Sequence, residues 1–247
     1  MDKVINAFLL STIAGFSSLI ALILMYIKVK NPKTIIITSL ACAGGVMITV
    51  SILDLIPKSI SLLKQTLNLN NVLPIVILSI LIGSFISKII STYIPENNDK
   101  LYKIGMVSLL AIILHNIPEG IATFLSYGVD QKLGISLAIS IAFHNIPEAI
   151  SIVIPLYYAT KNKRKEFFYV LISALSEPFG SLLALLFLKN SINNISMGII
   201  LSMIAGIMIY IAIFELIINA KKYNKHIQLI LSIIFGISFM TIIHFLI

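Results

Sequence analysis

The sequence is poor in charge, contains no tryptophan and has a single cysteine. Only 11% of its 247 residues are charged, whereas 58% are hydrophobic, and the mean hydropathy is +1.03. Because about a quarter of the residues in soluble domains are charged, this composition excludes an ordinary soluble domain. A lone cysteine, Cys42, excludes an intrachain disulfide and a cysteine-based metal cluster.

Acidic residues are also scarce, because ten Asp and Glu stand against eighteen Lys and Arg and the formal net charge is +8. A basic protein could bind nucleic acid, but these cations lie in short connectors between apolar runs and not along one helix face. We therefore expect no nucleic-acid partner. The lipid bilayer is the expected surrounding, and the cations are interpreted as signals that set the topology in it.

Long apolar runs are what the sequence has instead, and eight of them reach the length of about 20 residues that a membrane-spanning helix needs. The first run lacks the basic start and the cleavage pattern of a signal peptide, so it is interpreted as a span. The sequence predicts an all-α polytopic membrane protein with one transmembrane domain over residues 1–247. The expected spans are residues 4–27, 34–57, 72–91, 103–127, 133–159, 167–188, 195–219 and 227–247.

Lys and Arg are unequally divided between the two sides of the membrane that these spans define. Thirteen of the eighteen follow spans one, three, five and seven, and such an excess marks the cytoplasmic side. We therefore expect a multi-pass protein of the plasma membrane with both termini outside. The fourth and fifth spans are joined only by residues 128–132, so they should be antiparallel neighbours.

Two copies of the sequence His-Asn-Ile-Pro-Glu lie in the fourth and fifth spans, beginning at His115 and His144. On a helix, residues three and four apart share a face, so each copy places His, Asn and Glu on one side. Imidazole and carboxylate groups bind first-row divalent metals, and an amide oxygen adds a neutral ligand. The candidate ligands are His115, Asn116, Glu119, His144, Asn145 and Glu148.

A structural alternative is a pair of kinked helices with hydrogen-bonded core histidines. It is disfavoured because ionisable groups inside a membrane are costly and usually functional, and here the group occurs twice. The other two histidines, His226 and His244, lie in a connector and near a helix end. For these two we expect no special role.

Further polar residues interrupt the other spans. Glu177 lies in the middle of the sixth span, where a metal ion or a structural hydrogen bond could compensate its charge, and the metal site is favoured. Asp54 and Glu215 could line a cation route or be helix-end charges, and the residues leave this open. Met47 shares a side of the second span with Asp54 and could supply a sulfur or only pack.

The two pentapeptides, with Ala-Gly-Gly-Val-Met at residues 43–47 and Ser176-Glu177, resemble the ZIP family of divalent-metal transporters. The resemblance is to its bacterial zinc-uptake branch and covers essentially the whole chain. It implies eight spans with both termini outside and a binuclear metal centre between spans four and five. Two features depart from the family pattern: Ala149 replaces a frequent glycine, and the connector after span three has no histidine run.

The resemblance further implies a transporter and not an enzyme, with the metal as substrate and not as cofactor. The expected activity is uptake into the cytoplasm of Zn²⁺, with Fe²⁺, Mn²⁺, Co²⁺ and Cd²⁺ as further candidates. It implies movement of spans one, four, five and six against the others, and a homodimer. The implied residues are His115, Glu119, His144 and Glu148 with nearby Met47 for one site, Asn116, Asn145 and Glu177 with shared Glu119 and Glu148 for the second, and Asp54 and Glu215 along the route.

Two other functions are alternatives to transport for this sequence. An intramembrane metalloprotease would need a His-Glu-x-x-His pattern, but Pro118 and Glu119 stand where that motif requires its later residues. A metal-sensing membrane subunit would be expected to carry an appended soluble domain, and the connectors are too short to hold one.

Overall fold

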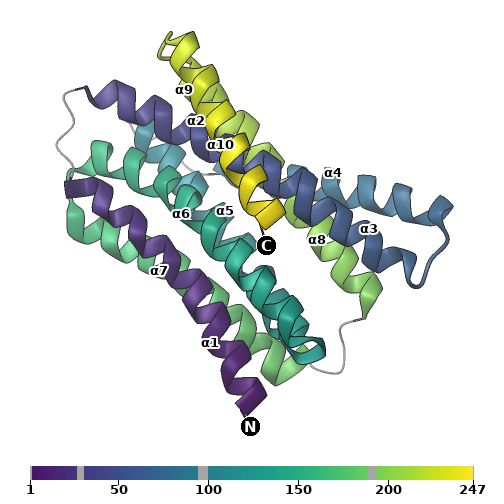
Figure 1. Cartoon of the computed structure of the whole chain (residues 1–247). Coiled ribbons are helices and arrows are strands. Elements are labelled where there is room, and N and C mark those ends of the chain that lie inside the picture. Colours follow the sequence, from purple (N-terminus) through teal and green to yellow (C-terminus); the bar gives the residue numbers. More distant parts are fainter. Residues whose placement is uncertain (1, 27–30, 94–99, 189–192, 247) are drawn as a thin grey trace.

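A computed structural model describes residues 2–26, 31–93, 100–188 and 193–246 of the chain (Figure 1). Within these ranges all regular structure is helical, and eight helical segments are long and apolar enough to cross a membrane. The predicted all-α polytopic fold is therefore confirmed. The predicted span ends at 27 and 247, and residues 28–30, 94–99 and 189–192 between predicted spans, lie outside the described residues.

The segments follow one another in the predicted order. The second runs on to Lys64, beyond the predicted end at residue 57. Pro57 comes shortly after a π-helical turn at Ser51–Leu55, and local adjustments of this kind let a membrane helix continue through a proline. The elements are α1 (Asp2–Phe16) with η1 (Ser17–Tyr26), α2 (Pro32–Val50) with η2 (Ser51–Leu55) and α3 (Ile56–Lys64), α4 (Leu69–Tyr93), α5 (Lys100–Val129), α6 (Gln131–Thr160), α7 (Lys163–Leu183) with η3 (Ala184–Leu188), α8 (Asn194–Tyr210) with η4 (Ile211–Ile217) and α9 (Ile218–Lys221), and α10 (His226–Leu246).

Short polar residues begin the helices that follow the tightest connectors. Asp130 caps α6 by accepting a hydrogen bond from the backbone N–H of Lys132, and Asn162 caps α7 in the same way. Such caps satisfy N–H groups that have no partner inside the helix. Since Asp130 alone separates α5 from α6, the chain must turn back at once. The two helices pack along each other as the predicted antiparallel neighbours.

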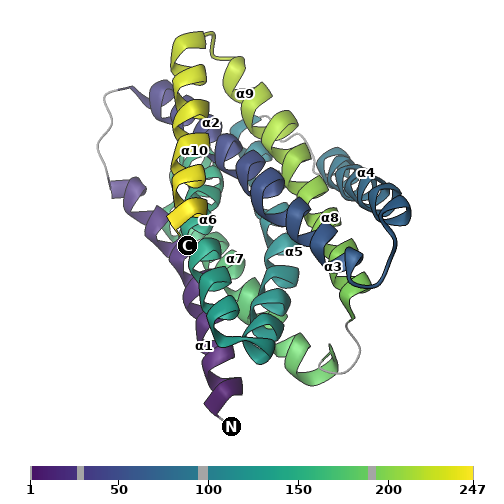
Figure 2. The ribbon, with the colours of Figure 1, turned by 45° about the vertical axis from the view of Figure 1, so that its right-hand side comes forward.

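The helices divide into two groups that pack mainly within themselves. One group is α1, η1, α5, α6 and α7, and the other is α2, α3, α4, α8 and α10 (Figures 1 and 2). Contacts of α2 with α6 and of α5 with α8 join the groups. This division coincides with the two sets of spans that the family resemblance suggests.

Large apolar side chains cover the outside of the bundle, most of all on α4 and α10. Leu81 and Phe85 of α4 and Phe235 of α10 are 60% to 64% exposed, and α4 lies at one edge of the molecule in both views (Figures 1 and 2). Polar and charged residues, by contrast, gather in the interior of α5, α6 and α7. This inside-out distribution is the one that a lipid surrounding favours.

Candidate metal centre

The two pentapeptides meet where α5 packs against α6, and their side chains pair across the helices. Nε2 of His115 lies 2.9 Å from Oε2 of Glu148, and Nε2 of His144 lies 3.5 Å from Oε1 of Glu119. Each imidazole thus faces the carboxylate of the other copy. Both helices continue through the proline inside each motif, so the ligand candidates project from regular backbone.

The asparagine of each copy turns its amide nitrogen away from this contact. The Asn116 amide donates to the backbone oxygen of Ser173 in α7 at 3.4 Å. The Asn145 amide donates to the backbone oxygen of Ala14 in α1 at 3.0 Å and also to the Glu177 carboxylate. Because an amide offers only its oxygen as a lone-pair donor to a cation, this arrangement leaves the useful atom of each asparagine free.

Glu177 reaches the two copies because α5 and α7 approach unusually closely. A Cβ added at Gly120 of α5 would lie 2.0 Å from the backbone oxygen of Glu177, and one at Gly180 of α7 would lie 2.0 Å from that of Ile117. Only glycine permits so close an approach of the two backbones, so these two glycines allow α7 to pack against the first motif. Glu177 is then near enough to Glu119 to interact with it electrostatically.

Burial is nearly complete for every member of this cluster, since none of its seven residues is more than 2% exposed as a whole. Many of their polar atoms have no hydrogen-bond partner among the described residues. These atoms are Nδ1 of His115, Oδ1 of Asn116, both carboxylate oxygens of Glu119, both ring nitrogens of His144, Oδ1 of Asn145, Oε1 of Glu148 and Oε2 of Glu177. Burying such groups without partners costs several kcal/mol each, and a divalent cation would offset that cost.

The donor set therefore fits a metal ion in chemistry, although the described side chains are not gathered around one point. In that part of the chain, no three His, Cys, Asp or Glu side chains form a group that could hold a metal ion as they stand. Instead, each histidine contacts one glutamate of the other copy directly. An arriving cation would have to separate these pairs and take both partners as ligands.

A cavity of 430 Å³ leads to the cluster from one end of the bundle. Glu119 and His144 line its inner part, and Asp54 from η2, Lys58 from α3 and His244 from α10 line it as well. Serine hydroxyls at positions 61, 136 and 140 add to its polar wall. This cavity connects the paired motifs with the side of the molecule on which α3 and the start of α6 lie.

The three auxiliary candidates, Asp54, Met47 and Glu215, lie in different surroundings. Asp54 lines the cavity. Met47 is fully buried in the hydrophobic cluster that α2 forms with α8 and η4. Glu215 lies in η4 and accepts a hydrogen bond from Ser91 of α4, and it is absent from the described lining of the cavity.

Sequence reasoning assigned no role to one residue of the cavity wall, His244. Its ring contacts Asp54, which lies 190 positions away in the chain. A histidine three residues from the end of an apolar span carries no local signal of such a contact. Only the packing of α10 against η2 reveals it.

A helical bundle with many spans, a buried cluster of imidazole, carboxylate and amide groups, and a cavity with charged and hydroxyl side chains leading to it, belongs to the class of membrane cation transporters. Residues 98–244 match the family described as ZIP zinc transporter. The chain is 35% identical to the zinc transporter ZupT of Clostridium perfringens over 98% of this chain and 96% of that protein. Identity to the ZupT protein of Streptococcus mutans is also 35%, over 96% of both chains, and to that of Chlorobium chlorochromatii it is 36%, over 98% and 97%.

The chain therefore belongs to the ZIP family of zinc transporters. It is a multi-pass transporter of divalent metal ions in the plasma membrane and not an enzyme, and the metal is its substrate and not a cofactor. The predicted resemblance and the predicted class of activity are confirmed. The metalloprotease alternative is excluded by the same finding.

Proposed function

We propose that this protein carries Zn²⁺ into the cytoplasm through the paired motifs of α5 and α6. The observation that supports it is the reciprocal pairing of His115 with Glu148 and of His144 with Glu119, surrounded by buried oxygens that lack partners. Nitrogen and oxygen ligands of this kind suit zinc and its neighbours in the first row. The relatives named above carry the same substrate in their names.

The ligands divide into two adjacent sets in this proposal. His115, His144 and the two paired glutamates hold one ion, after it has separated the histidine–glutamate contacts. The amide oxygens of Asn116 and Asn145 and the free oxygen of Glu177 hold a second. Glu119 and Glu148 each keep at least one carboxylate oxygen without a hydrogen bond in the described structure, which suits them to bridge the two ions.

Asp54 is proposed as a residue of the cation route, and the lining of the cavity supports this role. Glu215 has weaker support, because its carboxylate is bonded to Ser91. Met47 would act by packing near the centre, since its side chain lies in the apolar core. None of these three is proposed as a primary ligand.

Zinc uptake into liposomes that contain the purified protein tests the proposed substrate. Zinc uptake should be saturable, and Fe²⁺, Mn²⁺, Co²⁺ and Cd²⁺ should compete with it to degrees that rank their affinities. Mg²⁺ and Ca²⁺ should compete poorly because they prefer all-oxygen sites. Zinc binding by the wild-type protein without any uptake would contradict the proposal and favour a metal-sensing subunit.

The proposed orientation places both termini outside, so that the cavity opens away from the cytoplasm. The excess of Lys and Arg on the opposite side supports it. In a Cys42→Ala background, Lys132→Cys in the first turn of α6 should react with a membrane-impermeant maleimide on intact cells. Arg164→Cys, near the start of α7, should react only after the membrane is opened, and the reverse pattern would contradict this orientation. Both native side chains are exposed.

The exposed apolar faces of α4 and α10 are proposed to contact lipid acyl chains. For the homodimer that the family resemblance implies, we propose the outer face of α4, which lies at one edge of the molecule (Figure 1) and exposes Leu81 and Phe85, as the contact surface.

A further inference from the structure

A histidine and an aspartate from distant parts of the chain meet in the cavity that leads to the paired motifs. Nδ1 of His244 in α10 lies 2.5 Å from Oδ1 of Asp54 in η2. Their side chains are 30% and 26% exposed, whereas those of Glu119 and His144 further in are 3% exposed. The pair therefore lies at the outer part of the cavity and the paired motifs at its inner part.

The local backbone supports a functional role for Asp54. Its segment η2 is a π-helical turn between α2 and α3, and such turns occur frequently at functional sites because they redirect a side chain from the regular helix face. The second carboxylate oxygen, Oδ2, is buried and has no hydrogen-bond partner within the described residues. One oxygen of Asp54 thus remains free for a ligand even while the other contacts His244.

The charges around the pair indicate a weak site. Lys58 lies one helical turn after Asp54 and lines the same cavity, so its ammonium group repels a cation bound there. The remaining polar wall near the pair consists of serine hydroxyls. A site on a transport route must bind well enough to capture the ion and weakly enough to release it, and one carboxylate opposed by one ammonium meets both conditions.

We propose that Asp54 and His244 form an outer transit site for a divalent transition-metal cation, separate from the centre at the paired motifs. The carboxylate and the imidazole each supply a ligand, and water holds the other positions of the ion. The partly dehydrated ion then passes to Glu119 and His144 at the inner part of the cavity. This inference rests on the proposed function, because it assigns the first binding step of that uptake.

A purely structural contact is the competing interpretation, in which the ring N–H of His244 only fastens α10 to η2. His244→Gln distinguishes the transit site from a structural contact, because glutamine keeps an N–H donor for Asp54 but is a poor ligand for zinc. Asp54→Asn is the complementary variant, since its amide oxygen can still accept from His244 while the negative charge is lost. A structural role predicts nearly normal behaviour of both variants.

Zinc binding to the full-length protein gives the first test. With the inner centre disabled by His115→Ala, Glu119→Ala, Glu148→Ala and Glu177→Ala, which together remove ligands from both of its proposed sets, calorimetry should detect one remaining zinc ion, bound weakly and not displaced by Ca²⁺. Adding His244→Gln or Asp54→Asn should remove it. Zinc that stays bound in both of these variants, or no remaining zinc at all, would overturn the outer site. This readout does not depend on whether the protein transports, so failure of the proposed function is seen separately.

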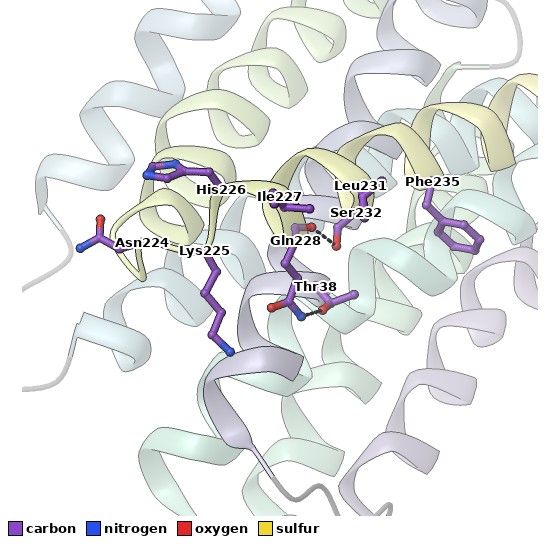
Figure 3. A pocket seen from close by; sticks show the side chains of 9 residues that line it. All are labelled: Thr38, Asn224, Lys225, His226, Ile227, Gln228, Leu231, Ser232 and Phe235. Atoms are coloured by element: carbon purple, nitrogen blue, oxygen red, sulfur yellow. Dashed lines mark hydrogen bonds between the residues drawn. The ribbon is translucent and has the colours of Figure 1, made fainter.

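Uptake kinetics give the second test. In the otherwise unchanged protein, His244→Gln should raise the KM for zinc roughly tenfold and leave the maximal rate almost unchanged, because the inner centre stays intact. An unchanged KM would contradict the proposal. The control is His226→Gln, since His226 is the histidine at the other end of α10 and belongs to a separate surface pocket with Lys225 and Gln228 (Figure 3). This control should behave as wild type in both tests.

Discussion

Alanine at His115 or at Glu148 should abolish zinc uptake while the protein remains folded. Each substitution removes one ligand and leaves its partner buried without a hydrogen bond. Loss of an outer-shell partner alone costs roughly 10–100-fold in metal affinity or activity, so loss of a ligand should cost at least about 100-fold. Uptake into liposomes measures this, with thermal unfolding in detergent to verify folding.

The double variant sharpens this prediction. Because the two residues act as one unit, His115→Ala with Glu148→Ala should be scarcely worse than either change alone. His226→Ala is the matched control, since this exposed histidine lies outside the cluster, and it should transport normally. If the single variants kept more than half of wild-type uptake, the transport site would have to lie elsewhere.

Alanine at Gly120 or Gly180 should impair both stability and uptake, although neither residue offers a ligand. The added Cβ would meet a backbone oxygen at 2.0 Å, so α7 would have to move away from α5. Overpacking of this kind lowers the free energy of unfolding by about 1–3 kcal/mol. It also withdraws Glu177 from the first motif, and uptake should fall roughly tenfold or more.

Gly128→Ala supplies the matched control for this pair, because a Cβ there would meet nothing within 4 Å. It lies near the end of the same helix as Gly120 and adds the same methyl group. Thermal unfolding and zinc uptake should both remain at wild-type values. Equal behaviour of the Gly120 and Gly128 variants would mean that the close approach of α5 and α7 is not needed for the site.

Much of the fold could be predicted from the sequence because a bilayer imposes a simple rule. Each span must be a helix about 20 apolar residues long, so hydropathy alone located the eight spans. The short connector of residues 128–132 predicted that the two motif helices are neighbours. The continuation of the second helix through Pro57 to Lys64 was not predicted, because a proline within an apolar run usually indicates a helix end, and the π-helical turn that precedes Pro57 has no sequence signal of its own.

The candidate ligands followed from residue chemistry, since imidazole and carboxylate groups inside apolar spans are costly to bury and usually serve a function. The contacts that these ligands make with one another could not be predicted from the sequence. Helical spacing places His115 and Glu119 on one face, but the structure pairs His115 with Glu148 of the other helix. The orientation of the asparagine amides depends on backbone oxygens of α1 and α7, which no motif contains.

The membrane class, the number of spans, the adjacency of the two motif helices and the kinds of ligand were all predictable, because each depends on local composition and spacing. Which groups face one another became known from the packed helices alone. These contacts are the crossed histidine–glutamate pairs, the approach of Glu177 at two glycines, and the contact of His244 with Asp54 across 190 positions. The rotation and separation of packed helices arise from many side chains acting together, so no local sequence pattern predicts these contacts.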